Sequence, residues 1–414
     1  MAEDTSYKES RADWLGVIPQ EWSTCLLKYI FSIEKRIAGT VGHTVLSVTQ
    51  SGIKPKDMSA QGQFAQDYSK YQLVYPGDFA MNHMDLLTGW VDISAYEGVT
   101  SPDYRVFVNT DESRYVSEYY KYIFQYCYTN RVFYGMGQGV SGFGRWRLPA
   151  NMFLNFRLPV PPYKEQIVIS EYLKKKTAQI DALISEAKAS IDEYKQWKAS
   201  IIHEAITKGI DPDVGMVDSG IRWIGMIPNH WKITRIKNET INLDSLREPI
   251  SAENRENRLG LYDYYGASGV IDKIDDYNVD DTVLLIGEDG ANLKMRNLPL
   301  VYRASGRFWV NNHAHILKVN DENNYGYVAY LLEAGDYTEY ITGAAQPKLS
   351  QFNLMRFPIP IAPRVEQDAI EAYLDNKIGE IDALIKEKEA LISDLDMYKR
   401  ALIFELVTGK RRVV

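Results

Sequence analysis

The chain has 414 residues, 45% of them hydrophobic and 25% charged, which is the composition of a soluble globular protein with two or three domains. Its two cysteines exclude a disulfide framework and a cysteine-based zinc site, and no apolar run reaches the roughly 18 residues of a membrane helix, so we expect a cytoplasmic protein. The net charge of −8 argues mildly against a nucleic-acid partner but does not exclude one, because a local basic patch is enough to bind DNA.

The first half opens with an aromatic motif and continues as a mixed α/β domain. The motif is Trp14-Leu15-Gly16-Val17-Ile18-Pro19-Gln20-Glu21-Trp22. Runs of β-branched and aromatic residues predict strands, and glycine and proline clusters predict turns. The expected elements are strands at Val41–Val48, Tyr71–Tyr75 and Tyr104–Val108, turns at Pro76–Asp78 and Gly135–Gly139, and a helix at Ser117–Tyr128. The prolines at 159, 161 and 162 end this domain.

A long helix follows and ends at Gly209, a residue suited to a helix C-terminus. Its apolar residues show the three-and-four spacing of a coiled-coil seam, broken at Ser190. We expect this seam to be buried and to form part of a surface for partner chains. It consists of Ile180, Leu183, Ala187, Tyr194, Trp197 and Ile201.

The second half repeats this order. The motif returns as Trp223-Ile224-Gly225-Met226-Ile227-Pro228-Asn229-His230-Trp231. Expected next are strands at Thr282–Ile286 and Ala314–Val319, a turn at Gly287–Gly290 and a helix at Tyr325–Leu332. The second long helix has the seam Ile381, Leu384, Leu391, Leu395, Tyr398 and Leu402.

The two long helices match each other without a gap, from Glu165 and Glu366 through Thr207 and Thr408, whereas the globular parts hardly align. A repeat of this length is a duplicated domain with its helix, because solenoid units are far shorter. We therefore expect an α+β fold with internal pseudo-two-fold symmetry, in which two α/β domains are joined by two long helices that form an antiparallel coiled coil. The expected division gives 1–162 and 210–363 to the domains, and 163–209 and 364–414 to the helical segments.

The motif that opens each half, and the proline-rich turn, Glu-Gln pair and Ile-Asp-Ala-Leu-Ile helix that close it, resemble the specificity subunit of type I restriction-modification systems. The resemblance covers essentially the whole chain. Further matching segments are Gly98–Tyr104 in the first half, and Gly343–Lys348 and Phe357–Pro360 in the second. The first half departs from the pattern at Gly137–Val140, where no lysine matches Lys348.

The resemblance implies a DNA-recognition role. Such subunits contain two target recognition domains, and each recognises one half of a split sequence in double-stranded DNA. Two modification subunits, which are adenine methyltransferases, bind the coiled coil. Two restriction subunits, ATP-driven translocases with a nuclease, join that core in a bacterial or archaeal defence complex. The chain itself would be no enzyme and would hold no cofactor, since S-adenosylmethionine, ATP and Mg²⁺ would be bound by the partner subunits.

Sequence signals of catalysis are weak. The segment Val160-Pro161-Pro162-Tyr163 resembles a methyltransferase loop, but Val160 cannot accept the hydrogen bond that orients a target amino group. A metal site at His313 and His315 would lack a third ligand nearby in sequence. Two alternatives to the DNA-recognition subunit are a coiled-coil adaptor that binds protein without DNA specificity, and a self-sufficient DNA-modifying enzyme, which the missing motifs disfavour.

Candidate DNA contacts are cations and amides on loops, because such side chains contact base edges and phosphates. Those predicted are Lys54, Lys56, Arg131, Arg145 and Arg147 in the first domain, and Arg255, Arg258, Lys294, Arg296, Arg303, Arg307, Gln346 and Lys348 in the second. Glycine-rich surroundings favour Arg145, Arg147, Lys294 and Lys348, since glycine lets the backbone approach a phosphate. For Lys348 we expect a phosphate contact.

Overall fold

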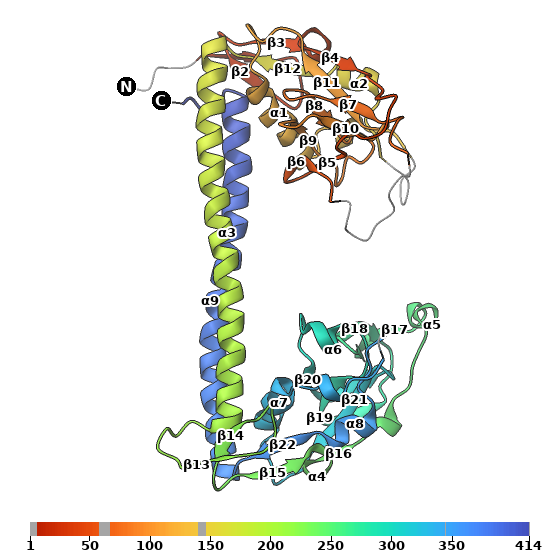
Figure 1. Cartoon of the computed structure of the whole chain (residues 1–414), viewed down its shortest axis with the longest axis vertical. Coiled ribbons are helices and arrows are strands. Elements are labelled where there is room, and N and C mark those ends of the chain that lie inside the picture. The colour runs from red at the N-terminus through yellow and green to blue at the C-terminus, as the bar shows by residue number, and fades with distance from the viewer. Residues whose placement is uncertain (1–5, 58–66, 140–145, 344, 414) are drawn as a thin grey trace. The chain divides into compact units, whose positions relative to one another are not determined.

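The computed structural model describes residues 6–57, 67–139, 146–343 and 345–413 (Figure 1). It divides into two compact units, the first made of residues 1–187 and 390–414 and the second of residues 188–389. Each unit therefore contains one globular domain and half of each long helix. The predicted α+β architecture, with two sheet-containing domains and two long helices, is confirmed.

The long helices are α3 (Tyr163–Lys208) and α9 (Arg364–Val407), with 46 and 44 residues. Each begins directly after a proline and ends at a glycine in the left-handed region, Gly209 at φ 76° and Gly409 at φ 73°. Both units pair the helices in the same antiparallel register. Lys399 bonds Asp181 at 2.6 Å in the first unit, and Lys198 bonds Asp382 at 2.7 Å in the second.

These two ion pairs are equivalent in the duplication. Asp181 corresponds to Asp382 and Lys198 to Lys399, so the lysine of each copy bonds the aspartate of the other. The residue numbers of the two pairs add up to the same total, which means that one antiparallel register holds in both units. The duplicated helices are thus matched in contacts as well as in sequence.

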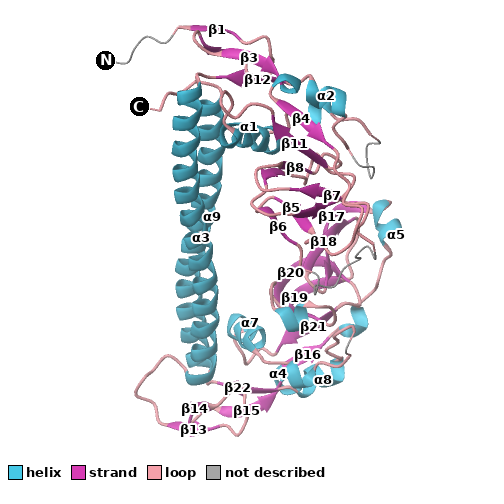
Figure 2. Ribbon diagram, turned by 45° about the horizontal axis from the view of Figure 1, so that its top comes forward, coloured by secondary structure: helices cyan, strands magenta, loops and turns pink. Residues whose placement is uncertain are grey.

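The first globular domain is built on a four-stranded antiparallel sheet with helix α1 (Ser117–Thr129) packed on it (Figure 2). Phe31, Phe79 and Phe107 of the sheet contact the ring of Phe124 in α1 and form the centre of the core. In sheet order the strands are β4 (Phe31–Glu34), β11 (Arg105–Asn109), β8 (Phe79–Met81) and β9 (Val91–Ile93).

Short elements surround this sheet. Four two-stranded pairs are β1 (Tyr7–Glu9) with β2 (Val17–Pro19), β3 (Ser23–Leu26) with β12 (Arg157–Val160), β5 (Leu46–Thr49) with β6 (Gly52–Pro55), and β7 (Gln72–Val74) with β10 (Gly98–Thr100). The helical turns are η1 (Leu27–Tyr29), η2 (Tyr134–Met136) and α2 (Ala150–Leu154). The strand predicted at Val41–Val48 is shorter than expected, because regular pairing begins only at Leu46.

The second domain has a six-stranded sheet covered by α7 (Tyr325–Ala334). In order its strands are β16 (Thr240–Asn242), β21 (Ala314–Val319), β19 (Val279–Gly287), β20 (Val301–Val310), β17 (Leu259–Gly266) and β18 (Gly269–Ile274). The other elements are the pairs β13 (Met216–Asp218) with β14 (Met226–Pro228) and β15 (Lys232–Arg235) with β22 (Pro358–Ile361), and the turns α4 (Ile236–Glu239), η3 (Asp244–Leu246), α5 (Ala252–Glu256), α6 (Asn292–Met295), η4 (Thr338–Tyr340) and α8 (Gln351–Arg356).

The repeated aromatic motif attaches each domain to the first turn of its helix. The indole N–H of Trp22 donates to Glu165 at 2.9 Å, and that of Trp231 donates to Glu366 at the same distance. The neighbouring glutamine, Gln166 or Gln367, is fully buried and bonds backbone groups of the domain. The motif and the Glu-Gln pair therefore recur together because they form one structural joint.

The predicted seam of the long helices is wrong in part. Positions buried as expected are Ile180, Ala187, Ile381 and Leu402; Tyr194, Ile201 and Leu395 are half-buried; and Leu183, Trp197, Leu384, Leu391 and Tyr398 are exposed. In the first unit α3 buries Ile184 beside Ile180, in one core with Leu402 and Leu406 of α9. The buried stripe is turned from the predicted one because each half-helix packs on a globular domain as well as on the other helix.

Candidate nucleic-acid interface

A turn that ends in an exposed cation is built in the same way in both units. In the second unit the backbones of Thr342 and Lys348 exchange two hydrogen bonds of 2.8 Å, and Leu349 N–H donates to the Glu288 carbonyl at 2.8 Å. In the first unit Gln138 and Arg147 exchange bonds of 2.8 and 3.1 Å, and Leu148 N–H donates to the His83 carbonyl at 2.9 Å. Both leucines are fully buried, and both cations are exposed.

A buried nitrogen-containing side chain on a central strand holds each turn. His315 of β21 donates from Nε2 to the Leu349 carbonyl at 2.8 Å, and Arg105 of β11 donates from Nη2 to the Leu148 carbonyl at 2.9 Å. The two strands occupy equivalent places, since β21 lies between β16 and β19 as β11 lies between β4 and β8. The pairing is also equivalent, because His315 pairs with Ile286 and Arg105 with Met81. Arg147 is therefore the counterpart of Lys348, so an arginine stands where the sequence comparison found no matching lysine.

The equivalence of Arg147 and Lys348 is difficult to recognise from the sequence. The gap-free match of the helices extends back through Phe156 and Phe357 to Arg147 and Lys348, but the side chains on the way differ. The glycine-rich segment Gly137–Val140 resembles Gly343–Lys348 in composition, but it is not the segment that aligns with Lys348. Only the hydrogen bonds to the sheet show which residues take the same place, because the turn is held by strands far away in sequence.

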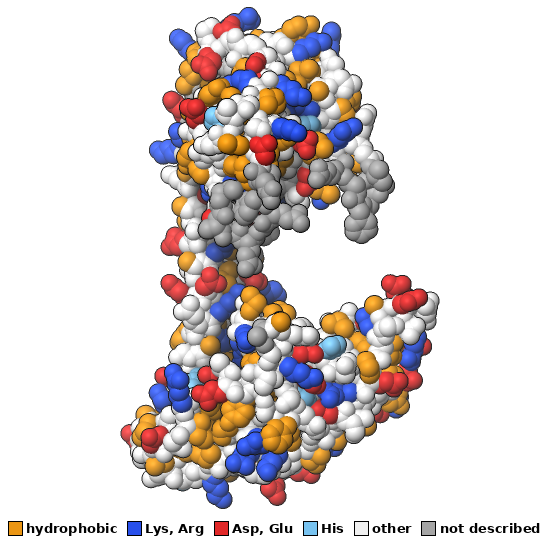
Figure 3. Space-filling view, turned by 45° about the vertical axis from the view of Figure 1, so that its right-hand side comes forward, with side chains coloured by type: hydrophobic (Ala, Val, Ile, Leu, Met, Phe, Trp, Pro, Cys, Tyr) orange, Lys and Arg blue, Asp and Glu red, His pale blue; other side chains and the backbone are white. Residues whose placement is uncertain are grey.

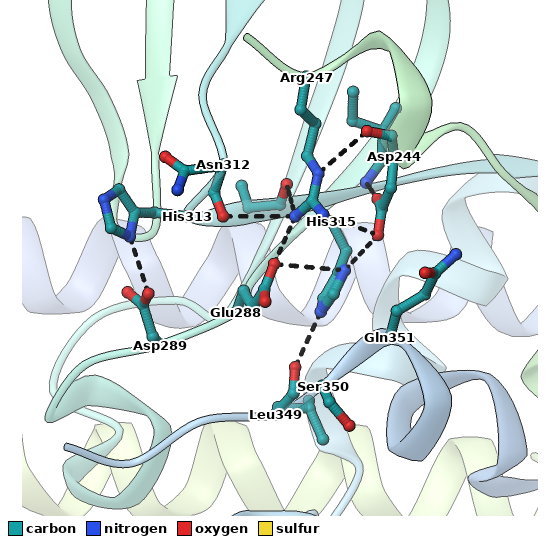
Figure 4. Close-up of polar contacts among 12 residues, drawn as sticks. Asp244, Arg247, Glu288, Asp289, Asn312, His313, His315, Leu349, Ser350 and Gln351 are labelled. Atoms are coloured by element: carbon teal, nitrogen blue, oxygen red, sulfur yellow. Dashed lines mark hydrogen bonds and ion pairs between the residues drawn. The ribbon is translucent and has the colours of Figure 1, made fainter. Parts of the chain in front are cut away.

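Figure 4 shows a network of polar and charged side chains in the second unit, which Lys348 joins through its ion pair with Glu288. His315 is fully buried, and its Nδ1 faces the Asp244 carboxylate at 2.6 Å while Nε2 faces the Leu349 carbonyl. Both ring nitrogens of His315 thus lie at hydrogen-bond distance from an oxygen atom. Arg247 bonds the Glu288 carboxylate and also approaches Asp244 at 3.4 Å. The network joins η3, the end of β19, β21 and the turn into one rigid surface.

Glu288 is the centre of this network. Its side chain is 9% exposed, and its Oε1 lies 2.9 Å from Lys348 Nζ, while Oε2 bonds Arg247. Burial opposes ionisation of Glu288, but the hydrogen bonds from Lys348 and Arg247 outweigh it and lower its pKa. Burial likewise opposes ionisation of Asp244, whose pKa is lowered by His315 and by the Ile316 N–H. Both carboxylates are thus ionised partners of the surrounding cations.

Acidification should destabilise the second unit through these carboxylates. The pKa values of Asp244 and Glu288 are lowered from 3.8 and 4.5 by folding, so their contribution is present above those values and is lost as the pH falls through the folded ones. We expect the free energy of unfolding to decrease below about pH 4.5. Asp244→Asn should flatten this decrease in urea titrations of the full chain at neutral and acid pH. An unchanged pH dependence in the variant would contradict this role.

The first unit has no carboxylate at the position of Glu288. His83 takes that place, and burial together with Arg105 and Arg147 lowers its pKa to about 4, so it is neutral at physiological pH. Arg105 is 5% exposed and stacks on Phe153 at 4.7 Å, and burial lowers its pKa to about 10. Among the described residues Arg147 has no ion pair. Arg147 therefore has no carboxylate partner in the described part of the chain, whereas the charge of Lys348 is compensated by Glu288.

Several of the other predicted DNA contacts form ion pairs with acidic side chains. Arg255, Arg258 and Arg307 are paired with Asp272, Asp275 and Asp280 at 3.0, 2.9 and 2.9 Å. On the face shown in Figure 3, cationic and acidic side chains of the second unit are accordingly interspersed. Pairing of this kind leaves these arginines less available to phosphates than the sequence suggested.

The structure brings together only some of the remaining candidates. Arg296 and Arg303 bond backbone carbonyls of the α7 region and line a cavity with Lys195 and Lys198 of α3. The predicted turn Gly287–Gly290 lies against the Lys348 turn, since Gly290 N–H donates to the Pro347 carbonyl at 3.0 Å. Exposed candidates are Lys54 on β6, Lys56, Arg131 after α1, Lys294 on α6 and Gln346. Arg145 lies outside the described residues.

Sequence reasoning missed Asp244, Arg247 and Glu288. The signal available was an aspartate and an arginine three positions apart directly after a strand, which is weak without knowledge of their partners. His313 and His315, considered for a metal, each bond a different carboxylate, Asp289 and Asp244. The described residues contain no cluster of three or more side chains suited to a metal ion. No helix in the described part is long and apolar enough to cross a membrane.

Comparison with known proteins gives one family. Residues 228–393 match the model of the type I restriction modification DNA specificity domain. A putative type I restriction enzyme specificity subunit of Haemophilus influenzae is 30% identical over 133 residues, which cover 32% of this chain and 34% of that protein. The MjaVIII specificity subunit of Methanocaldococcus jannaschii is 24% identical over 66% of each chain. The chain thus spans about a third of the length of the first relative and about two thirds of the length of the second.

Solved structures show the same fold at low sequence identity. A chain from a study of assembly and conformational transition in the type I R-M system aligns with a TM-score of 0.71 and 13% identity, over 95% of this chain and 99% of that one. The HsdS subunit of Thermoanaerobacter tengcongensis aligns with a TM-score of 0.50 and 14% identity, over 95% and 98% of the two chains. Residues 228–393 are thus similar to the type I restriction modification DNA specificity domain, and the chain is similar in sequence and fold to specificity subunits of type I restriction-modification systems.

Proposed function

We propose that this chain is the non-catalytic DNA-recognition subunit of a type I restriction-modification complex, in which each globular domain recognises one half of a bipartite site. The observation that carries the proposal is the matched turn: one backbone frame presents an exposed cation, Arg147 or Lys348, in both domains. Cations on rigid turns suit contacts to phosphates and base edges. Because the neighbouring residues differ, the half-sites should differ and the whole site should not be a palindrome.

The long helices are proposed to bind two modification subunits. Exposed apolar side chains occupy corresponding positions of the two copies, Leu183 with Leu384 and Trp197 with Tyr398. In this antiparallel register Tyr398 lies within one residue of the position opposite Leu183 in the first unit, and Trp197 within one residue of the position opposite Leu384 in the second. We call these two pairs the apolar stripes. Two equivalent stripes suit two copies of one partner, which would carry the methyltransferase chemistry and bind S-adenosylmethionine; restriction subunits would bind ATP and Mg²⁺.

A protein adaptor without DNA specificity is the competing function. The net charge of −8 and the pairing of Arg255, Arg258 and Arg307 with acidic residues favour it. Such an adaptor would use the same apolar stripes to hold its partners. It predicts no salt-dependent DNA binding by the assembled complex, whereas a recognition subunit predicts binding that depends on both salt and base sequence.

Exchange of one domain tests the proposed function. Residues 232–350 run from the first residue of β15 to the residue before α8, so replacing them with those of another specificity subunit leaves both long helices intact. With cognate modification subunits, mapping of methylated adenines should show one half of the target changed and the other half retained. In the unaltered protein one adenine in each half, on opposite strands, should be methylated, with an unread gap between the halves. A contiguous or palindromic motif would contradict the proposal.

A further inference from the structure

Resting on the proposed function, we infer that Lys348 contacts a base edge in the second half-site, not a phosphate, and that Glu288 is the positioning residue that gives this contact its specificity. The inference replaces the expectation of a phosphate contact drawn from sequence. It depends on two features of the turn in the second unit, the fixed position of the lysine and the compensation of its charge.

Lys348 is held in place from beneath. Glu288 is anchored through its backbone, since its N–H donates to the His313 carbonyl and its own carbonyl accepts from Leu349, both at 2.8 Å. Its side chain is held by Arg247 on one oxygen and bonds Lys348 at 2.9 Å with the other. One of the three ammonium donors is thus used, and the side chain remains 53% exposed with two donors left. Two directed donors match O6 and N7 of guanine in the major groove.

The charge balance at the turn disfavours a phosphate. Glu288 compensates the charge of Lys348, and Asp289, whose side chain is 17% exposed, adds a second carboxylate next to it. A phosphate that approached Lys348 would meet these carboxylates, whereas a neutral base edge would not be repelled. The first unit shows the opposite arrangement, because Arg147 has the neutral His83 beneath it. The two domains therefore differ in the charge of the side chain next to the cation.

The test is selection from DNA in which the first half-site is fixed and the second is randomised. The full chain is assembled with its modification subunits and compared with Lys348→Ala and Glu288→Gln. Lys348→Ala should reduce the preference for one base at one position by about 5- to 150-fold, the loss of one good base contact, without changing the salt dependence of binding. Glu288→Gln should lose the same preference but bind unrelated DNA more tightly, because the freed ammonium attracts phosphates.

Asp289→Asn is the matched control, because it removes a neighbouring carboxylate that pairs with His313 and not with Lys348. It should leave the base preference unchanged. The inference is overturned if Lys348→Ala weakens binding to all sequences equally and lowers the salt slope by about one, as for a phosphate contact. It is also overturned if Glu288→Gln and Asp289→Asn act alike, since Glu288 would then act by charge alone. If the unaltered protein selects no bases in the randomised half-site, the proposed function itself fails.

Discussion

Replacing Trp22 with alanine should lower the free energy of unfolding of the first unit by about 3 to 5 kcal/mol. The side chain is fully buried, and its indole N–H donates to Glu165 in the first turn of α3. The substitution leaves a cavity in the main core and removes the donor from a half-buried carboxylate. Urea unfolding of the full chain, followed by near-UV circular dichroism, measures the loss.

Trp197→Ala is the matched control on α3. Its side chain is 51% exposed, so the same truncation should cost less than about 1 kcal/mol. It should nevertheless weaken binding of the modification subunits, measured by calorimetry, because it removes the largest side chain of an apolar stripe. Equal destabilisation by both substitutions would show that Trp197 is buried in solution and would remove the argument for the stripes.

Replacing Gln367 with leucine should destabilise the second unit by about 2 to 5 kcal/mol. The glutamine is 1% exposed, accepts from the Asn324 N–H at 2.7 Å and donates to the Ala362 carbonyl at 2.8 Å. Leucine has a similar volume but leaves both backbone groups buried without a partner, and each such group costs about 1 to 3 kcal/mol. Thermal and urea unfolding measure the difference.

Gln196→Leu provides the comparison for this substitution, since Gln196 is exposed on α3. It should change the free energy of unfolding by less than about 0.5 kcal/mol. Gln166→Leu should repeat the large effect in the first unit, because Gln166 bonds Val116 N–H and the Pro161 carbonyl in the same way. A small effect at both buried glutamines would mean that the joint between domain and helix does not stabilise the units.

Elements whose signals are local can be predicted from the order of the amino acids alone. The helices predicted at Ser117–Tyr128 and Tyr325–Leu332 and the strand at Ala314–Val319 are found within two residues of their expected ends. Periodicity, prolines and terminal glycines act over a few residues, so these signals can be read directly. The duplication was equally plain, because the joint of tryptophan, glutamate and glutamine needs the same residues in both copies.

Which side chains are exposed and unpaired depends instead on contacts between residues that are far apart in the chain. The buried stripe of the long helices depends on the domain against which each half-helix packs, so Ile184 is buried and Leu183 is exposed. The pairing of Arg307 with Asp280 and of Lys348 with Glu288 joins residues distant in the chain. The equivalence of Arg147 and Lys348 was likewise hidden, because hydrogen bonds from remote strands place the turn, and backbone groups can make these bonds with almost any side chain.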